Sequence, residues 1–198
     1  LAKAPIRLPA QTGVKSGSFT EQEEFLDVAQ GKLGMGYVTP ITLRDPRYAA
    51  MQVCNTIFGA GMTSKLFMQV REKMSLCYDI GSGYHGSKGI VAVSAGIDCS
   101  KKDIVQTEIL AQLDACRQGN ITPEELNAAK QALISGLQGI HDTPGSIESY
   151  YATAALSGIG MSPEQYMEKV QAVTAEQAAS AAQSLQLNTV YFLKGVSQ

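Results

Sequence analysis

The sequence is poor in histidine, the residue on which most catalytic zinc sites depend. Its 198 residues include only two histidines, His85 and His141. Neither belongs to a His-x-x-Glu-His motif or to a reversed His-x-x-His pair, in which one face of a helix presents two zinc ligands. The sequence therefore predicts no metal site and no cofactor in this chain.

Cysteine is also scarce and is never paired in sequence. The four cysteines are Cys54, Cys77, Cys99 and Cys116. They are spread singly, with no Cys-x-x-Cys pair, and each lies within an apolar pattern. This distribution favours buried, reduced thiols over disulfide bonds.

Long apolar runs and blocks of one charge are absent as well. No stretch approaches the roughly 18 to 20 apolar residues that a membrane span requires, and the first residues do not resemble a signal peptide. The formal charge is -2 and the pI about 5.7, with acids and bases interspersed. We expect no membrane span, no nucleic-acid partner, and a soluble, cytoplasmic protein.

The composition suits one folded domain preceded by a linker. The chain starts at Leu1 rather than at a methionine, and its first segment is rich in proline, glycine and serine. We interpret residues 1–20 as a linker or N-terminal extension cut from a longer chain, and residues 21–198 as a single domain. With 44% hydrophobic residues, that domain can bury a substantial core.

Five segments have the pattern of β-strands. Residues 24–28 and 32–39 predict a hairpin or two adjacent strands at the start of the domain. Residues 76–84 and 90–98 flank a short polar loop and predict a second hairpin. Residues 189–194 predict a closing strand.

Helices fill the remaining sequence, and several have recognisable ends. We expect helices to start at Asp45–Pro46, at Thr63 or Ser64, at the capping box of Thr122, Pro123 and Glu125, at Ser162–Pro163, and at Thr174. We expect helices to end at Gly59 and at Gly119, and a further helix to contain Tyr150 and Tyr151. In the helix that ends at Gly119, the residues expected to face inward are Ile104, Ile109, Leu113 and Cys116. Strands first, helices afterwards and one returning strand indicate an α+β fold: a largely antiparallel sheet with helices packed mainly on one face.

The segment from Phe58 to Tyr78, FGAGMTSKLFMQVREKMSLCY, carries the strongest resemblance to a known family. Its glycines and its Val-Arg-Glu-Lys block resemble the second half of the pitrilysin or insulinase-type metallopeptidases, peptidase family M16, which includes the mitochondrial processing peptidases. The resemblance extends from Glu24 to Leu193 and includes the Thr-Pro-Glu-Glu-Leu segment at Thr122. Residues 76–89, LCYDIGSGYHGSKG, are similar to bacterial members that lack the zinc motif.

The resemblance implies a role within a larger assembly. Members of this family enclose a chamber between related α+β halves, and one half holds zinc through an inverted His-x-x-Glu-His motif. This chain resembles the other half, so zinc is expected in a partner half, in the same parent chain or in a second subunit. Arg71 and Tyr78, seven positions apart, match the arginine and tyrosine that reach across the chamber.

The chemistry of these two residues suits peptide hydrolysis. A tyrosine hydroxyl can donate a hydrogen bond to the oxygen that becomes negative when a peptide carbonyl is attacked, so Tyr78 would assist catalysis. An arginine offers several fixed donors for substrate carbonyls or carboxylates, so Arg71, together with Tyr78, would bind substrate. The ordinary alternative is a solvated arginine and a tyrosine that packs its ring.

Three functions follow from these observations. The first is the non-zinc C-terminal half of an M16-like peptidase, which binds peptide substrate, completes the chamber and is inactive alone. The second is a catalytically inert scaffold or binding subunit of such a heterodimer. The third is a free-standing ligand-binding domain unrelated to proteolysis. Gly59 and Gly61 do not favour a phosphate-binding loop, because the third glycine and the lysine-serine ending of a P-loop are missing.

Overall fold

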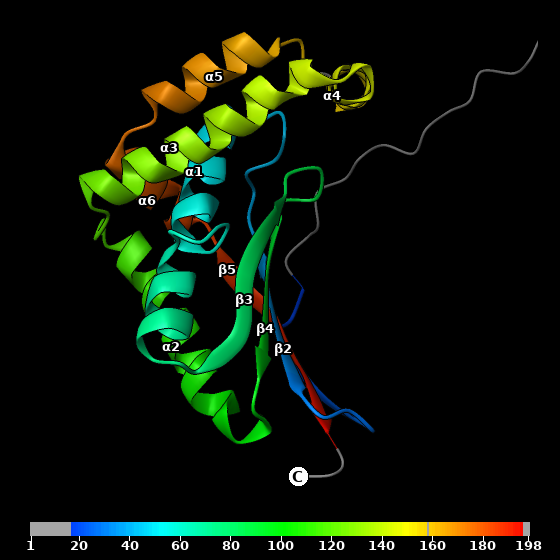
Figure 1. Ribbon diagram of the computed structural model, residues 1–198, viewed down its shortest axis with the longest axis vertical. Helices are drawn as coiled ribbons and strands as arrows, with labels where there is room; N and C mark the ends of the chain where they lie inside the picture. Colours follow the sequence, from blue (N-terminus) through cyan, green and yellow to red (C-terminus); the bar gives the residue numbers. More distant parts are fainter. Residues whose placement is uncertain (1–16, 158, 196–198) are drawn as a thin grey trace, which may run out of the picture.

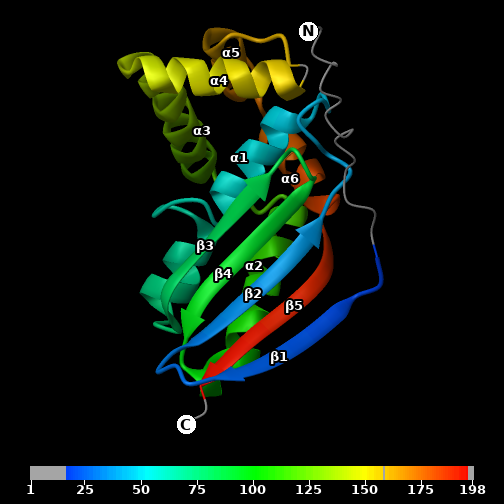
Figure 2. The ribbon, with the colours of Figure 1, turned by 90° about the vertical axis from the view of Figure 1, so that its right-hand side faces the viewer.

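The computed structural model describes residues 17–157 and 159–195, which form a sheet with helices on one side of it. Figure 1 views the sheet edge-on, and Figure 2 shows its other face free of helices. The strands are β1 (Thr20–Leu26), β2 (Gly31–Val38), β3 (Cys77–His85), β4 (Ile90–Ile97) and β5 (Gln186–Gly195). Their order is β1-β5-β2-β4-β3, and only β1 and β5 run parallel. The predicted fold class is confirmed.

The expected pairing of the first two strands is wrong. β5 lies between them, so that Phe192 pairs with Leu33 on β2 and with Glu23 on β1. β1 also begins at Thr20, four residues before the predicted start and at the last residue of the expected linker, most of which lies outside the described residues. The glutamates of β1 obscure the alternation of apolar and polar residues that marks a strand. Glu23 pairs with Lys102 of the helix layer at 2.6 Å, so a charged residue occupies a position where an apolar one is usual.

Nine helical segments are found in the described ranges. They are α1 (Tyr48–Phe58), η1 (Leu66–Lys73), η2 (Cys99–Lys101), α2 (Lys102–Arg117), α3 (Pro123–Gln138), η3 (Gly139–Asp142), α4 (Pro144–Ser157), α5 (Pro163–Ala172) and α6 (Ala175–Gln183). Capping boxes at Thr122, Ser162 and Thr174 open α3, α5 and α6, as the sequence predicts. Gly119, with φ of 76°, follows the end of α2 in the left-handed conformation that glycine allows.

Two helix predictions need correction. α1 begins at Tyr48, because Asp45 does not cap it but accepts hydrogen bonds from the backbone and side chain of Arg47. In α2, Ile104 is 49% exposed, and Val105 instead occupies the buried position one turn before Ile109. The predicted inward-facing set was therefore wrong by one position at Ile104, while Ile109, Leu113 and Cys116 are buried as predicted.

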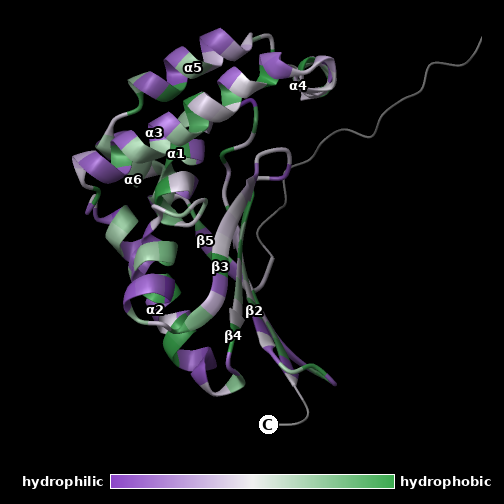
Figure 3. Cartoon of the chain, in the orientation of Figure 1, coloured by the Kyte–Doolittle hydropathy of each residue, from purple (hydrophilic) through white to green (hydrophobic). Residues whose placement is uncertain are grey.

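The core lies between the inner face of the sheet and helices α1, α2 and α6. Its largest fully buried side chains include Tyr37, Phe58, Phe192, Leu33, Met35, Leu66, Ile97 and Ile109. Hydrophilic residues are found on the outer turns of α2 and α5 (Figure 3). Across the described ranges, no helix is long and apolar enough to cross a membrane.

All four cysteines are free thiols. Cys54 and Cys116 are buried as predicted, whereas Cys77 and Cys99 are only half-buried at the start of β3 and just after β4. Burial raises the pKa of Cys54 and Cys116, with burial the largest cause for each. These two thiols are therefore expected to stay protonated and inert.

Candidate functional site

The turn between α1 and η1 sets the position of the candidate site. α1 ends at Gly59, where an added Cβ would lie 2.5 Å from Ser82 Oγ and 2.8 Å from Leu66 Cδ1. Gly61 has φ of 132°, a backbone angle that favours glycine. The two glycines thus allow a close approach to β3 and a sharp turn, and nothing in this geometry resembles a phosphate cradle.

Ser64 and Lys65 then start η1. The Ser64 hydroxyl accepts the Phe67 N–H at 3.3 Å, so Ser64 is the capping residue of the two that were predicted. Lys65 is buried and binds Glu125 at 2.8 Å, which fixes the start of η1 against the first turn of α3.

The predicted short helix is a π-helix rather than an α-helix. Its last turn is widened, since the Met74 N–H bonds the Gln69 carbonyl five residues back. Leu66 and Val70 are fully buried, but Met74, which an α-helix would place one turn after Val70 on the same face, is 40% exposed. The wider turn rotates the end of the helix away from the α-helical phase, and π-turns are frequent at functional sites.

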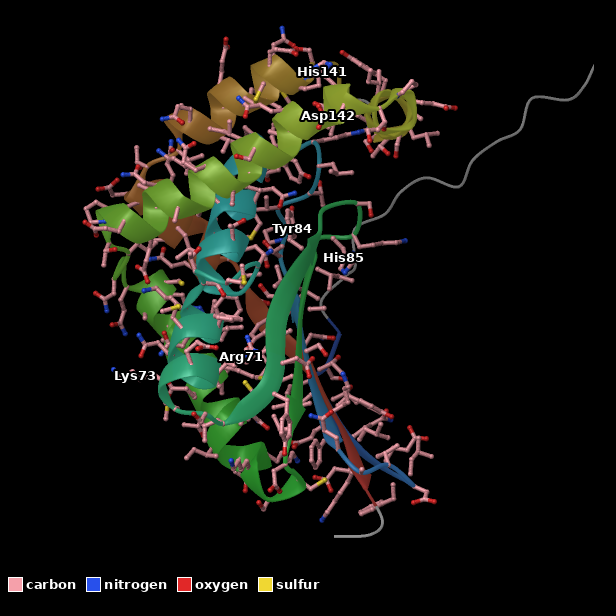
Figure 4. All side chains as sticks on the ribbon, in the orientation of Figure 1. Arg71, Lys73, Tyr84, His85, His141 and Asp142 are labelled. Carbon is pink, nitrogen blue, oxygen red and sulfur yellow. The ribbon has the colours of Figure 1, made fainter. Side chains whose placement is uncertain are left out.

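Arg71 and Tyr78 lie next to each other at the junction of η1 and β3. Arg71 Nε donates to the main-chain carbonyl of Tyr78 at 3.0 Å. The guanidinium also lies 4.6 Å from the centre of the Phe67 ring and 3.5 Å from a Glu72 carboxylate oxygen. Figure 4 shows Arg71 between η1 and β3, with Lys73 on the outer side of η1.

Tyr78 occupies a β-bulge. The β3–β4 register shifts between Cys77 and Asp79, which leaves Tyr78 as the extra residue. Bulges redirect side chains and occur often beside active sites. The Tyr78 side chain is 67% exposed and donates no hydrogen bond within the described residues, so its hydroxyl is free to meet a ligand.

The two residues line a pocket of about 470 Å³. The pocket is lined by Arg71, Glu72, Ser75, Leu76, Cys77, Tyr78, Asp98 and Lys101. Lys101 reaches the pocket from η2 and donates to the Ser75 carbonyl at 3.4 Å. Sequence reasoning missed Lys101 and Asp98, because they follow β4 and no spacing relates them to Arg71.

The thiol in this pocket is not a nucleophile. Burial, with a further contribution from Asp79, raises the pKa of Cys77 to about 11 and outweighs the opposing charges of Arg71 and Lys101. The thiolate is therefore scarce at neutral pH. The groups available for chemistry are the Tyr78 hydroxyl and the two cations.

The free edge of β3 is partly closed by its own neighbours. The Ser82 N–H donates to the Gly59 carbonyl at 2.9 Å, and the Tyr78 carbonyl accepts from Arg71. β3 is the last strand of the sheet, and its outward backbone groups would otherwise invite another strand. These backbone groups at Tyr78 and Ser82 are therefore not free to pair with an added strand, and the exposed side chain of Tyr78 remains available to a ligand.

Neither histidine is placed to hold a metal. His85 is exposed at the end of β3, and His141 is exposed and bonded to Glu164 at 2.8 Å (Figure 4). In the part of the chain that the structure describes, no three histidine, cysteine or acidic residues cluster as metal ligands. The described residues therefore do not fit the zinc centre of the family that the sequence resembles.

Comparisons with known proteins agree with the fold and with the resemblance. The family model described as "Peptidase M16 inactive domain" matches residues 2–133. A Bacillus subtilis protein named "Probable inactive metalloprotease YmfF" is 34% identical over 169 residues, which cover 85% of this chain and 40% of that protein. An uncharacterized zinc protease of Streptomyces coelicolor is 30% identical over 144 residues, 71% of this chain and 31% of that protein.

Solved structures show the same fold. A conserved protein from Enterococcus faecalis is 31% identical with a TM-score of 0.87, over 94% of this chain and 44% of that one. A peptidase M16 inactive domain from Pseudomonas fluorescens is 20% identical with a TM-score of 0.80, over 93% and 45% of the two chains. The chain thus spans less than half the length of these relatives. It belongs to the peptidase M16 family and corresponds to that family's inactive domain.

Proposed function

We propose that this chain is the half of an M16-type peptidase that binds peptide substrate and completes the proteolytic chamber of a zinc-bearing half. The observation that carries the proposal is the arrangement of Arg71 and Tyr78. Arg71 holds the backbone of the bulge, and the exposed Tyr78 hydroxyl is left at the mouth of a pocket. The expected partner is a zinc-bearing half, in the same parent chain or in a second subunit.

Each residue has a distinct part in this proposal. Tyr78 donates a hydrogen bond to the substrate oxygen that gains negative charge when a peptide carbonyl is attacked in the partner half. Arg71 uses Nε on the Tyr78 carbonyl, and one terminal nitrogen lies 3.5 Å from Glu72 Oε1. The remaining N–H donors of the guanidinium would bind a substrate carbonyl or carboxylate. The Arg71 side chain is 39% exposed, which leaves these donors accessible.

The size of the pocket favours an extended peptide over a folded protein surface. A volume of about 470 Å³ lies within the range of sites that hold a few side chains or a small ligand. Lys101 adds a second cation to the lining of the pocket, and Glu72 and Asp98 add two carboxylates. Mixed charges of this kind suit the polar backbone of a peptide more than a strongly charged ligand.

Peptide binding by the assembled pair tests the proposal. A fluorescein-labelled unfolded peptide is titrated with the chain and its zinc-bearing half, and fluorescence anisotropy is recorded. Arg71→Ala is expected to weaken binding about tenfold, the loss of one or two charge-assisted hydrogen bonds. Lys73→Ala, which removes an exposed cation from the same helix, is the matched control. Equal affinities for the two variants would contradict the proposal.

The alternative is a catalytically inert scaffold subunit. It is favoured by the 34% identity to a protein named as an inactive metalloprotease. In a scaffold the Tyr78 hydroxyl has no substrate to assist, so Tyr78→Phe would leave turnover by the assembled pair unchanged. The two functions therefore predict different effects of Tyr78→Phe on kcat: a decrease if the chain assists hydrolysis, and no change if it is a scaffold.

A further inference from the structure

A second cavity lies among α1, α3, α4 and α5, and it shares no lining residue with the pocket of Arg71 and Tyr78. Its volume is about 390 Å³, within the range of small-molecule sites. Most of its wall is apolar, with Leu133 and Leu137 from α3, Ala154 from α4, and Ile159 and Met161 from the segment before α5. A cavity of this composition takes an apolar group rather than a polar one.

A smaller hollow of about 310 Å³ opens beside the cavity. The two share the lining residues Leu43, Tyr48, Ile159, Met161 and Tyr166, so they adjoin. The smaller hollow, called here the mouth of the space, is polar and is lined by Arg44, Asp45 and Lys169 among others. The space therefore combines an apolar part with a charged part.

The charge at this mouth is positive. Arg44 Nε donates to the Ser157 carbonyl at 2.6 Å, and within the described ranges no carboxylate forms an ion pair with Arg44 or Lys169. Asp45 is neutralised by Arg47, which binds it at 2.8 Å. Two cations without an acidic partner thus line a hollow that adjoins an apolar cavity, and this arrangement attracts an anion that carries an apolar group.

A buried tyrosine hydroxyl lies where the two spaces meet. Tyr166 is 9% exposed, and its hydroxyl makes no hydrogen bond of good geometry with the described residues. Its ring stacks on Tyr48 at 5.6 Å, and its hydroxyl interacts weakly with the Tyr48 hydroxyl, which accepts from Gln52 at 2.7 Å. Burial is the largest cause that raises the pKa of Tyr166, so its hydroxyl remains a donor. A buried donor without a well-formed hydrogen bond gains from a ligand or water that accepts from it.

We propose that this space binds a small carboxylic acid with an unbranched apolar tail. The tail lies between α3 and α4, and the carboxylate meets Arg44 and Lys169 and accepts a hydrogen bond from Tyr166. Charge complementarity selects an anion, the apolar wall selects the tail, and the buried Tyr166 hydroxyl selects an acceptor. This inference does not depend on the proposed peptidase function, since the two sites share no residue.

Octanoate and octan-1-ol are the probes, because they share a tail and differ in charge. Isothermal titration calorimetry on the 198-residue chain should show octanoate binding at least about tenfold more tightly than octan-1-ol, as expected for a charge-assisted contact. Lys169→Gln should weaken octanoate binding and leave octan-1-ol binding unchanged, and Lys73→Gln should alter neither. Equal affinities for the two probes, or no binding of octanoate, would overturn the proposal.

A variant that fills the cavity locates the bound tail. Gly136 lines the cavity from α3, and a Cβ added there meets no atom within 4 Å, so Gly136→Leu can fold and occupy the space. It should abolish octanoate binding, whereas the neighbouring exposed Ser135→Leu should not. Tyr166→Phe should weaken octanoate binding several-fold while the melting temperature of the free protein stays equal or rises. Octanoate binding that survives Gly136→Leu would contradict the site.

Discussion

Arg71 Nε donates to the main-chain carbonyl of Tyr78, so the two candidate residues are joined through the backbone of the bulge. Arg71 therefore has a positioning role in addition to any contact with substrate. The Arg71 guanidinium also lies over the Phe67 ring, with its central carbon 4.6 Å from the ring centre. The direction of the Tyr78 side chain depends on the shape of Arg71 as well as on its charge.

Arg71→Lys should loosen the bulge without unfolding the protein. Lysine keeps the charge but lacks Nε and the planar face that lies on Phe67. Amide hydrogen exchange at Tyr78 and Asp79 should be about tenfold faster, while the free energy of unfolding changes by less than about 1 kcal/mol, as expected at an exposed position. Lys73→Arg is the matched control, and unchanged exchange in Arg71→Lys would contradict the positioning role.

Gly59 should tolerate no side chain. An alanine Cβ would collide with Ser82 Oγ at 2.5 Å, and that hydroxyl is held by Asn55 Oδ1 at 2.8 Å. Gly59→Ala should lower the free energy of unfolding by about 1–3 kcal/mol, the usual cost of overpacking.

Gly136→Ala provides the opposite case. It places a methyl group in open space within α3 and should stabilise the protein by about 0.5–1 kcal/mol. Urea unfolding of both variants measures the difference. If Gly59→Ala and Gly136→Ala change the free energy of unfolding by similar amounts, the contact between Gly59 and Ser82 is not the reason for glycine at position 59.

The turn before α1 should weaken in acid. Hydrogen bonds from the Arg47 side chain are the main cause that lowers the pKa of Asp45. A lowered pKa in the folded state means that this stabilisation is complete above the unfolded value, near 4, and is lost as the pH falls through the folded value. The difference in free energy of unfolding between wild type and Asp45→Asn, up to about 1 kcal/mol at pH 7 for a partly exposed pair, should vanish near pH 2. A difference independent of pH would argue against this pairing.

Cysteine labelling should separate the thiols by burial. At pH 8 and in the folded protein, iodoacetamide should leave Cys54 and Cys116 unmodified, and should modify Cys77 more slowly than in urea because its pKa is raised to about 11. Mass spectrometry after different times gives the rates. Modification of Cys54 at the same rate in folded and unfolded protein would contradict the observed core.

Local sequence signals predicted the helices better than the strand order. The capping boxes at Thr122 and Ser162 depend on side chains three residues apart, which the sequence shows directly. The insertion of β5 between β1 and β2 depends on residues roughly 150 to 170 positions apart, and no local pattern reports it. The alternation of glutamates in β1 also concealed its true start, because Lys102 neutralises them only in the folded chain.

The family resemblance proposed Arg71 and Tyr78 as site residues but gave no geometry for them. The structure places the two next to each other. The π-helical turn, the bulge and the bond from Arg71 to a carbonyl result from packing between η1 and β3, which spacing along the chain does not encode. The roles of these residues in peptide binding and catalysis stay predictions, as does the domain boundary at residue 21.

Turnover of a fluorogenic unfolded peptide by the chain combined with its zinc-bearing half tests the central claim most directly. The chain alone should be inactive, and Tyr78→Phe should lower kcat of the pair about 10²-fold or more, as does the loss of one donor to a developing oxyanion. KM should change little, and Tyr151→Phe, which removes the hydroxyl of another exposed tyrosine, should match wild type. If Tyr78→Phe retains full kcat, Tyr78 does not assist hydrolysis and the chain is a scaffold; if the chain alone hydrolyses the peptide, it is not a non-catalytic half.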